Sequence, residues 1–324
     1  MARRGQCPDP PQLARRRMPL PVASGPKPHK GMDGVALSRL FPILTVLAAL
    51  VAVWYAGSVW MNSGWTLAQA ERSGQELSLS EIVADAMVQE RPRLPPPHQV
   101  LAELKKTVID TKVTSKRSLV FHSWITLSST LAGFTLGTLV GILAAVGIVY
   151  SRTLKMALMP WAIISQTIPI VAIAPMIIVV LASMGVEGRA VPKAIISAYL
   201  CYFPVLVGMS KGLRSPDGMQ LDLLKTYGAN GRQTFWKLRF PSSMPYFFTS
   251  LKIGVAAALV GTIVGELPTG AIRGLGARIL IGDQFGNPIM IWAALIMAAC
   301  LAAALVGTVA GLQRVTARRM GFSR

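Results

Sequence analysis

Long apolar stretches alternate with polar, basic segments along most of this chain. The first stretch, Phe41 to Trp60, has 20 residues without a charge, about the length that crosses a hydrocarbon core of ~30 Å. Five further apolar stretches follow, at 123–150, 156–184, 194–210, 246–267 and 284–313. The alternation predicts an all-α, polytopic membrane protein with six transmembrane helices.

Proline and glycine interrupt or mark some of these stretches. Pro160, Pro169 and Pro175 break the third, so the freed carbonyls there need neighbouring helices or a cavity. Gly133, Gly137 and Gly141 recur at a spacing of four in the second. They share one helix face and would let another helix approach closely. Glycine is also simply frequent in membrane helices, and that alternative stays open.

The segments outside the apolar stretches complete the domain organisation. Residues 1–36 are rich in Pro, Arg and Gly and predict a disordered cytosolic tail, with no apolar region after the arginines to suggest a signal peptide. Met18 or Met32 are alternative starts. We divide the rest into a first transmembrane helix (37–60), an extracytoplasmic loop with an amphipathic surface helix at 100–108 (61–117), a core of five helices (118–315) and a basic tail (316–324).

A polar, basic island, DLLKTYGANGRQTFWKLRFP from Asp222 to Pro241, separates two apolar stretches. Leu221, Leu224 and Tyr227 recur every three residues on one helix face. Gly228 suits the left-handed residue that ends a helix, and a second short helix follows. Pro241 is expected to end it, because proline lacks the N–H that would continue the helix. Two helices this short need another surface to lie against.

Charge gives the orientation of the spans. The chain has 324 residues, is 52% hydrophobic and 15% charged, and carries a net charge of +19. With six spans both termini lie on one side, and the segments on that side hold 21 of the 33 Lys and Arg residues. The positive-inside rule therefore predicts that the termini and the polar island are cytosolic. Membrane topology and attraction to anionic lipid account for the basic charge, and nucleic acid is not predicted as a partner.

Motifs of catalysis are missing from the sequence. There is no G-x-x-x-x-G-K-[ST], no G-x-S-x-G and no H-E-x-x-H pattern. The histidines and cysteines are too scattered for a metal site or a disulfide framework: His29, His98, His122, Cys7, Cys201 and Cys300. We predict no catalytic residue, no metal and no cofactor in this chain, and no enzymatic activity of its own.

The polar island resembles the EAA loop of ABC-importer permeases. Asp222-Leu-Leu, Gly228 and the Leu238-to-Pro241 segment match its spacing, with Asp in place of Glu and two leucines in place of alanines. An ordinary amphipathic connector is the alternative. Other segments are similar to the nitrate, sulfonate, taurine, pyrimidine and riboflavin branch of that family: LPPPHQVLAEL, Gln166-Thr-Ile-Pro169 with Ala174-Pro175, Arg214-Ser-Pro-Asp217 and GELPTGAIRGLGARI from Gly265. The likeness covers roughly residues 40 to 315.

This resemblance implies the membrane-spanning subunit of a type I ABC importer in a bacterial inner membrane. ATP and Mg would then be held by separate ATPase subunits, and a second copy of the chain would complete the pathway. An extracytoplasmic solute-binding protein would deliver a small organic solute or oxyanion. Within the coupling loop, at about 217–241, the expected ATPase contacts are Asp222, Leu223, Leu224, Gly228, Leu238 and Pro241.

Polar side chains in or at the ends of apolar spans are candidates for the translocation path. They are Gln166, Thr167, Tyr199, Tyr202 and Glu266. The two tyrosines share a helix face and could stack on a planar solute. The plainer alternative is that such groups make interhelical hydrogen bonds or anchor helices at the interface, where Glu266 would stay in water.

Two other functions remain open from the sequence. An ion-coupled secondary transporter would need charged residues deep within spans and an internal repeat, and neither is evident. A non-transporting membrane scaffold would use the polar island to dock a partner without regard to nucleotide.

Overall fold

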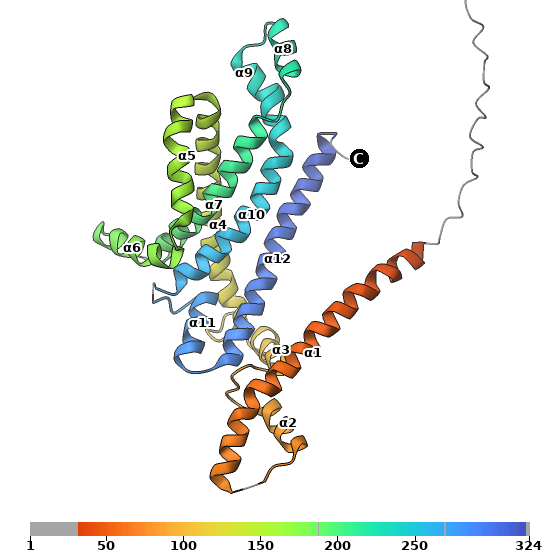
Figure 1. Cartoon of the computed structure of the whole chain (residues 1–324). Helices are drawn as coiled ribbons and strands as arrows, with labels where there is room; N and C mark the ends of the chain where they lie inside the picture. Colours follow the sequence, from red (N-terminus) through yellow and green to blue (C-terminus); the bar gives the residue numbers. More distant parts are fainter. Residues whose placement is uncertain (1–31, 75, 187, 269, 322–324) are drawn as a thin grey trace, which may run out of the picture. The chain divides into compact units, whose positions relative to one another are not determined.

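The computed structural model describes residues 32–74, 76–186, 188–268 and 270–321, with side chains from residue 41 onward. Every regular element in these ranges is a helix, which confirms the all-α prediction (Figure 1). The disordered tail predicted for 1–36 lies almost wholly outside them, as do Cys7, Met18 and His29. By its contacts the chain forms two units, Met1–Ala52 and Val53–Arg324.

The first span belongs to a longer helix than its apolar residues predict. Helix α1, Met32–Ser73, continues well past Trp60. Polar side chains on this extension are paired within the second unit: Asn62 Nδ2 donates to Ala86 O at 3.2 Å and to Leu94 O at 3.0 Å, and Thr66 Oγ1 donates to Asp85 Oδ2 at 2.8 Å. The extension is held by helix α2, Leu79–Val88, and by the segment that follows it.

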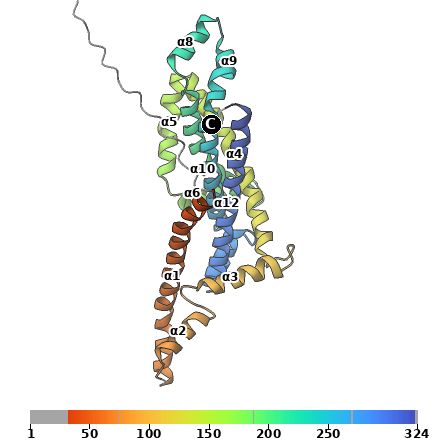
Figure 2. The ribbon, with the colours of Figure 1, turned by 90° about the vertical axis from the view of Figure 1, so that its right-hand side faces the viewer.

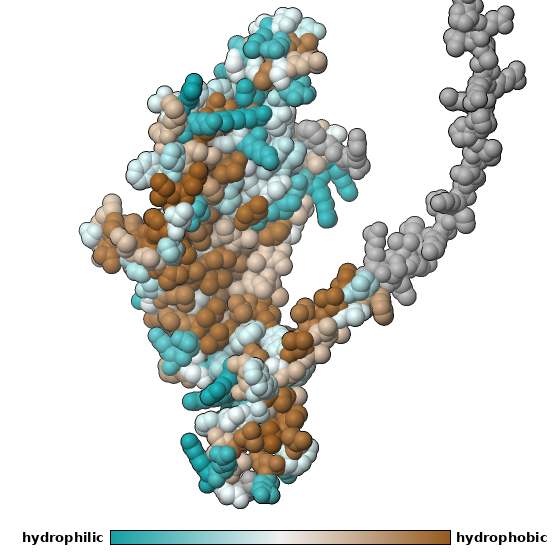
Figure 3. Space-filling model, in the orientation of Figure 1, coloured by the Kyte–Doolittle hydropathy of each residue, from teal (hydrophilic) through white to brown (hydrophobic). Residues whose placement is uncertain are grey.

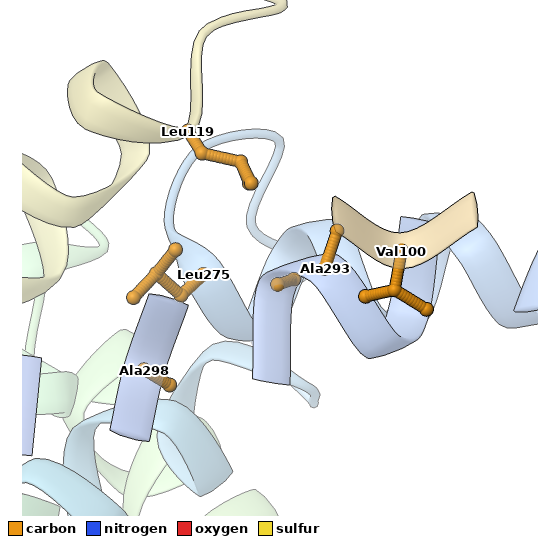
Figure 4. Packing of buried hydrophobic residues seen from close by; sticks show 6 residues of the cluster. Val100, Leu119, Leu275, Ala293 and Ala298 are labelled. Atoms are coloured by element: carbon orange, nitrogen blue, oxygen red, sulfur yellow. The ribbon is translucent and has the colours of Figure 1, made fainter. Parts of the chain in front are cut away.

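The amphipathic helix predicted at 100–108 is present, and one side of it is buried against other helices. It comprises α3, Pro97–Lys105, and the π-helical turn η1, Lys106–Asp110. Val100 is fully buried in a cluster with Leu119, Leu275, Ala293 and Ala298 (Figure 4). The last two belong to helix α12, Pro288–Arg319, so α3 packs against a span.

Helices α4, Leu119–Tyr150, and α7, Ala190–Leu213, form the centre of the bundle and run parallel. The predicted glycine face of α4 is turned toward α7. A Cβ atom on Gly133 would lie 2.4 Å from Ser197 Cβ, and one on Gly141 would lie 2.8 Å from Tyr202 O. No side chain fits between the helices there, because real Cβ contacts are longer.

Helix α10, Phe240–Glu266, packs antiparallel to α7 on the other side. Gly212, near the end of α7, lies against Ser243, and Gly261, near the end of α10, lies against Ser197. Helix α12 in turn packs along α10, with Val255 and Leu259 among the buried residues of their contact. The short helix α11, Leu275–Gln284, joins α10 to α12.

The proline-broken stretch at 156–184 folds as two helices. Helix α5, Arg152–Thr167, and helix α6, Ile170–Ser183, are bent by 107° at Ile168 and Pro169. Among the described residues, five helices are long and apolar enough to cross a membrane, and this bent pair is a possible sixth crossing. Because α4 and α7 are parallel, α5 and α6 together return the chain to the end of the bundle where α4 began.

The surface matches this arrangement. Figure 3 shows apolar side chains gathered over the middle of the second unit, with hydrophilic residues at the end that carries α8 and α9 and again toward the opposite end.

Candidate functional site

The polar island forms two short helices beyond the ends of α7 and α10 (Figures 1 and 2). The first is α8, Gly218–Thr226, and the second is α9, Gly231–Thr234. Between them Gly228 has φ +71°, its N–H donates to Lys225 O at 2.9 Å, and Ala229 N donates to Leu224 O at 3.0 Å. This is the glycine-ended helix that the sequence predicts, since a left-handed residue with a side chain is strained there.

The predicted helix end at Pro241 is wrong. Helix α9 continues through the π-helical turn η2, Phe235–Arg239, directly into α10. Pro241 sits in the first turn of α10, directly after the π-helical turn. Its missing N–H interrupts no regular i→i−4 hydrogen bonding there, because the wider π turn precedes it. The second half of the loop is therefore continuous with a membrane-spanning helix.

The outer surface of this coupling loop carries exposed apolar side chains. Met219, Leu223 and Tyr227 are 85%, 56% and 79% exposed. Asp222 forms an exposed ion pair with Lys225 at 3.0 Å, a contact that contributes little to stability. Leu224 and Leu238 are half-buried. A surface with this many large apolar groups on one small projection favours burial against another protein.

The base of the loop is tied to the ends of two spans by arginines. Arg214 Nη2 donates to Ile148 O at 3.0 Å, near the end of α4. Arg239 Nη1 donates to Leu213 O at 3.0 Å, at the end of α7. Cations at helix C-termini donate hydrogen bonds to unpaired carbonyls and interact favourably with the negative end of the helix dipole. Neither contact was predicted from the sequence, because each arginine bonds to a carbonyl far away along the chain.

Four of the five predicted path residues lie together at the bend between α5 and α6. Tyr199 OH donates to Ser165 O, the Tyr202 hydroxyl is hydrogen-bonded to Ser165 Oγ, and Gln166 Nε2 donates to Ser165 Oγ at 3.4 Å. The tyrosine rings are tilted by 54° with centroids 6.2 Å apart. Thr167 is exposed and bonds within its own helix. The two tyrosine hydroxyls thus make interhelical hydrogen bonds, as the plainer alternative to a path role predicted. The half-buried tyrosine rings still border the bend.

Glu266 is separate from this group and is fully buried, so the alternative that left it in water is wrong. Its carboxylate lies 3.2 Å from Lys193 Nζ and accepts from Thr126 Oγ1 at 3.0 Å and from Gly276 N at 2.7 Å. Lys193 is itself 4% exposed. The fourth apolar stretch of the sequence begins at 194, one residue after this lysine, so the pair was not predicted.

Backbone groups of α11 complete the network around Glu266. Leu275 N donates to Thr126 Oγ1 at 2.9 Å, and Gly274 N donates to His122 Nδ1 at 2.9 Å. A carboxylate beside the first turn of a helix is favoured by the helix dipole. One face of α4 and the end of α10 together hold the N-terminus of α11. Among the described residues no group of three His, Cys, Asp or Glu side chains is placed to hold a metal ion.

Comparison with protein families identifies the chain. Residues 137–322, from the middle of α4 through α12, match the family described as "Binding-protein-dependent transport system inner membrane component". The chain belongs to this family of ABC transporter permeases. The match covers the coupling loop, the bent pair and Glu266, and α1 to α3 lie outside it.

Individual relatives of the permease transport different solutes. This chain is 33% identical over 176 residues to a probable ABC transporter permease protein of Haemophilus influenzae, and the alignment covers 54% of this chain and 69% of the relative. It is 32% identical over 185 residues to the formylaminopyrimidine transport permease ThiX of Halalkalibacterium halodurans, covering 56% and 71%. The riboflavin transport permease RibX of Chloroflexus aurantiacus is 30% identical over 197 residues, covering 61% and 71%.

The fold of the permease is similar to a solved ABC importer. A chain of the MetNI methionine ABC transporter, in an inward-facing conformation, superposes with a TM-score of 0.52 at 18% identity. The superposition covers 61% of this chain and 95% of that one. At this identity the likeness concerns the helical fold.

Proposed function

We propose that the permease forms half of the membrane pathway of a bacterial ABC importer. Its coupling loop docks into a separate ATPase subunit that binds ATP and Mg, a second copy of the chain completes the pathway, and an extracytoplasmic binding protein delivers a small organic solute or oxyanion. The observation that carries the proposal is the coupling loop: exposed apolar side chains around a left-handed Gly228, on a chain of the permease family.

The parallel packing of α4 and α7 supports a topology of six crossings. If α5 and α6 count as one bent crossing, α1, α4, α7, α10 and α12 supply the others. Both termini and the coupling loop then share one side, and the excess of Lys and Arg assigns that side to the cytosol.

The connections of the loop support a mechanical role. Closure of the ATPase pair on ATP would displace α8 and α9, and the displacement would reach α4 and α7 through Arg214 and Arg239. It would reach α10 through the continuous helix of η2. A bundle with inward-open and outward-open packings would shift between them according to nucleotide state.

The number of spans supports pairing with a second copy, because six crossings supply half of the membrane pathway of such an importer. Trp161, Val171 and Met176 on the bent pair are all largely exposed, so they are open to lipid or to that second copy.

Docking can be tested by co-purification of the permease with its proposed ATPase subunit. Leu223→Asp and Gly228→Asp should abolish co-purification, because each places a charge, and the second also a strained side chain, on the docking surface. Leu79→Asp, on an apolar residue of α2 that is even more exposed than Leu223, is the control and should co-purify normally. Wild-type affinity of both loop variants would refute the proposal.

Transport assays in proteoliposomes separate the alternatives. With the ATPase and binding protein present, solute uptake should require ATP on the side of the membrane where the ATPase is bound. Uptake that follows an ion gradient without nucleotide would instead support a secondary transporter, for which the buried Lys193–Glu266 pair supplies a charged group inside the bundle.

A further inference from the structure

A cavity with a strongly basic lining opens at the end of the bundle opposite the coupling loop. Its volume is about 640 Å³, and it lies between the beginnings of α4 and α7, the segment after α10, and α11. Five of the side chains that line it are cationic: Lys116, Arg189, Lys193, Arg273 and Arg278. Hydroxyl and apolar groups, among them Ser128, Ser129 and Ile125, make up much of the rest, and no described lining residue is acidic.

One of the five cations is neutralised inside the protein. Lys193 pairs with Glu266, whose carboxylate is fully buried behind it and does not line the cavity. The described residues contain one other salt bridge, in the coupling loop, so none of the remaining four cations is paired with a described carboxylate. A recess in the protein therefore gathers four cationic groups that form no salt bridge with a described carboxylate, although Glu103 acts electrostatically on Arg278.

The contacts of these four cations show which of their N–H donors remain available to a ligand. Arg278 Nη2 donates to Arg117 O at 2.9 Å, while its Nε is buried without a hydrogen-bond partner among the described residues. Burial lowers the pKa of Arg278, an effect that Glu103 opposes from outside the cavity lining. The Arg273 guanidinium lies 5.9 Å from the centre of the Phe121 ring. Arg189 and Lys116 are exposed.

Unpaired cations in a concave site focus the electrostatic field and raise the local concentration of anions. Guanidinium groups also present a planar pair of donors that matches carboxylate, sulfonate and phosphate oxygens. A volume of about 640 Å³ lies within the range of small-molecule sites. The cavity thus has both the charge and the size for a small anionic molecule.

We propose that this cavity binds the acid group of a small anion, a carboxylate, sulfonate or phosphate, and that the solute carried by the permease is anionic. The inference rests on the proposed function, because it takes the transported solute as the source of the acid group. A phospholipid headgroup has the same chemistry, and the test below separates the two sources.

Binding is measured by calorimetric titration of the purified permease in phosphatidylcholine nanodiscs. The probes are methanesulfonate and inorganic phosphate, with dimethyl sulfone as a neutral molecule of nearly the same shape as methanesulfonate. Wild-type permease should bind at least one anion and not the sulfone. The double variant Arg189→Gln/Arg273→Gln should bind that anion at least tenfold more weakly. The double variant Arg152→Gln/Arg314→Gln, with the same loss of charge outside the cavity, should bind it as the wild type does.

Three outcomes would overturn the proposal. These are no binding of either anion by the wild type, equal binding of the sulfone, and unchanged affinity of the Arg189→Gln/Arg273→Gln variant. In a second arm the nanodiscs contain phosphatidylglycerol at constant ionic strength. If this lipid displaces methanesulfonate from the wild type, the site belongs to a headgroup and the anionic solute is refuted. Failure of anion binding, while Leu223→Asp still separates the ATPase, would remove this inference and leave the proposed function standing.

Discussion

A lysine and a glutamate separated by 73 positions in the sequence face each other in the interior of the bundle. Charges removed from water are costly, and the cost is offset only when the pair and its hydrogen bonds stay complete. Thr126 and Gly276 provide those bonds to Glu266. The stability of the pair therefore depends on all four groups together.

Lys193→Met should destabilise the permease by about 3–5 kcal/mol, because it leaves the carboxylate of Glu266 buried without its cation. The measurement is reversible unfolding in mixed micelles, followed by circular dichroism. Lys155→Met removes an exposed lysine at the other end of the bundle and should change stability by less than about 0.5 kcal/mol.

The double variant Lys193→Met/Glu266→Met decides whether the loss comes from the stranded charge. It should recover most of the stability that Lys193→Met loses, since two apolar side chains replace a buried ion pair at little cost. If the double variant is as unstable as the single one, the pair does not act as described.

The sequence permits some of these residue-level features to be predicted and not others. The break at Gly228 follows from local chemistry, because a glycine after an amphipathic turn is the usual end of a helix. The Lys193–Glu266 contact is not local: it depends on how α7 and α10 pack, and a single sequence holds no record of that pairing. Lys193 also lies at the edge of an apolar stretch, where a lysine normally reaches water.

Between elements, the contact of α4 with α7 depends on the absence of side chains at Gly133, Gly137 and Gly141. Gly137→Ala should destabilise the permease by about 1–3 kcal/mol, because the added Cβ would lie 2.7 Å from Ala198 O and the helices must separate. The measurement is the thermal unfolding midpoint in detergent.

Gly311→Ala in α12 is the matched control for this contact. A Cβ atom there meets nothing within 4 Å, so the substitution should be neutral or stabilise the helix by up to about 1 kcal/mol. Equal destabilisation by both substitutions would mean that glycine content, rather than close packing, sets the stability of these helices.

The positions of the helices could be predicted from the sequence where apolar runs or a proline determine them. The apolar runs located α4, α7, α10 and α12, and Pro169 located the bend after α5. The breaks predicted at Pro160 and Pro175 are wrong, because these prolines lie inside α5 and α6. Pro241 misled the prediction because proline ends a helix in its interior but is tolerated in a first turn, and the π-helical turn before it leaves no trace in composition. The bend of 107° also depends on packing that periodicity does not describe.

For the whole molecule, the orientation in the membrane is the property that the proposed function needs most. In a cysteine-free background, Tyr227→Cys should react with a membrane-impermeant maleimide only in inside-out vesicles. Lys112→Cys should react only in spheroplasts, because it lies in an exposed position on the opposite side of the proposed topology. Labelling of Tyr227→Cys in spheroplasts would place the coupling loop outside the cell and exclude its docking to a cytosolic ATPase.

Helix α10 has 27 residues and is therefore about 40 Å long. At one end it is the direct continuation of the coupling loop, and at the other its last residue holds the first turn of α11, which supplies Arg278 to the basic cavity. If α10 moved along its axis by about 1 Å while α11 stayed in place, the 2.7 Å contact between Glu266 and Gly276 would stretch beyond hydrogen-bonding range. The nucleotide cycle would then change the affinity of the basic cavity for anions. Anion binding there and ATP binding to the ATPase would be thermodynamically linked across the full thickness of the bilayer.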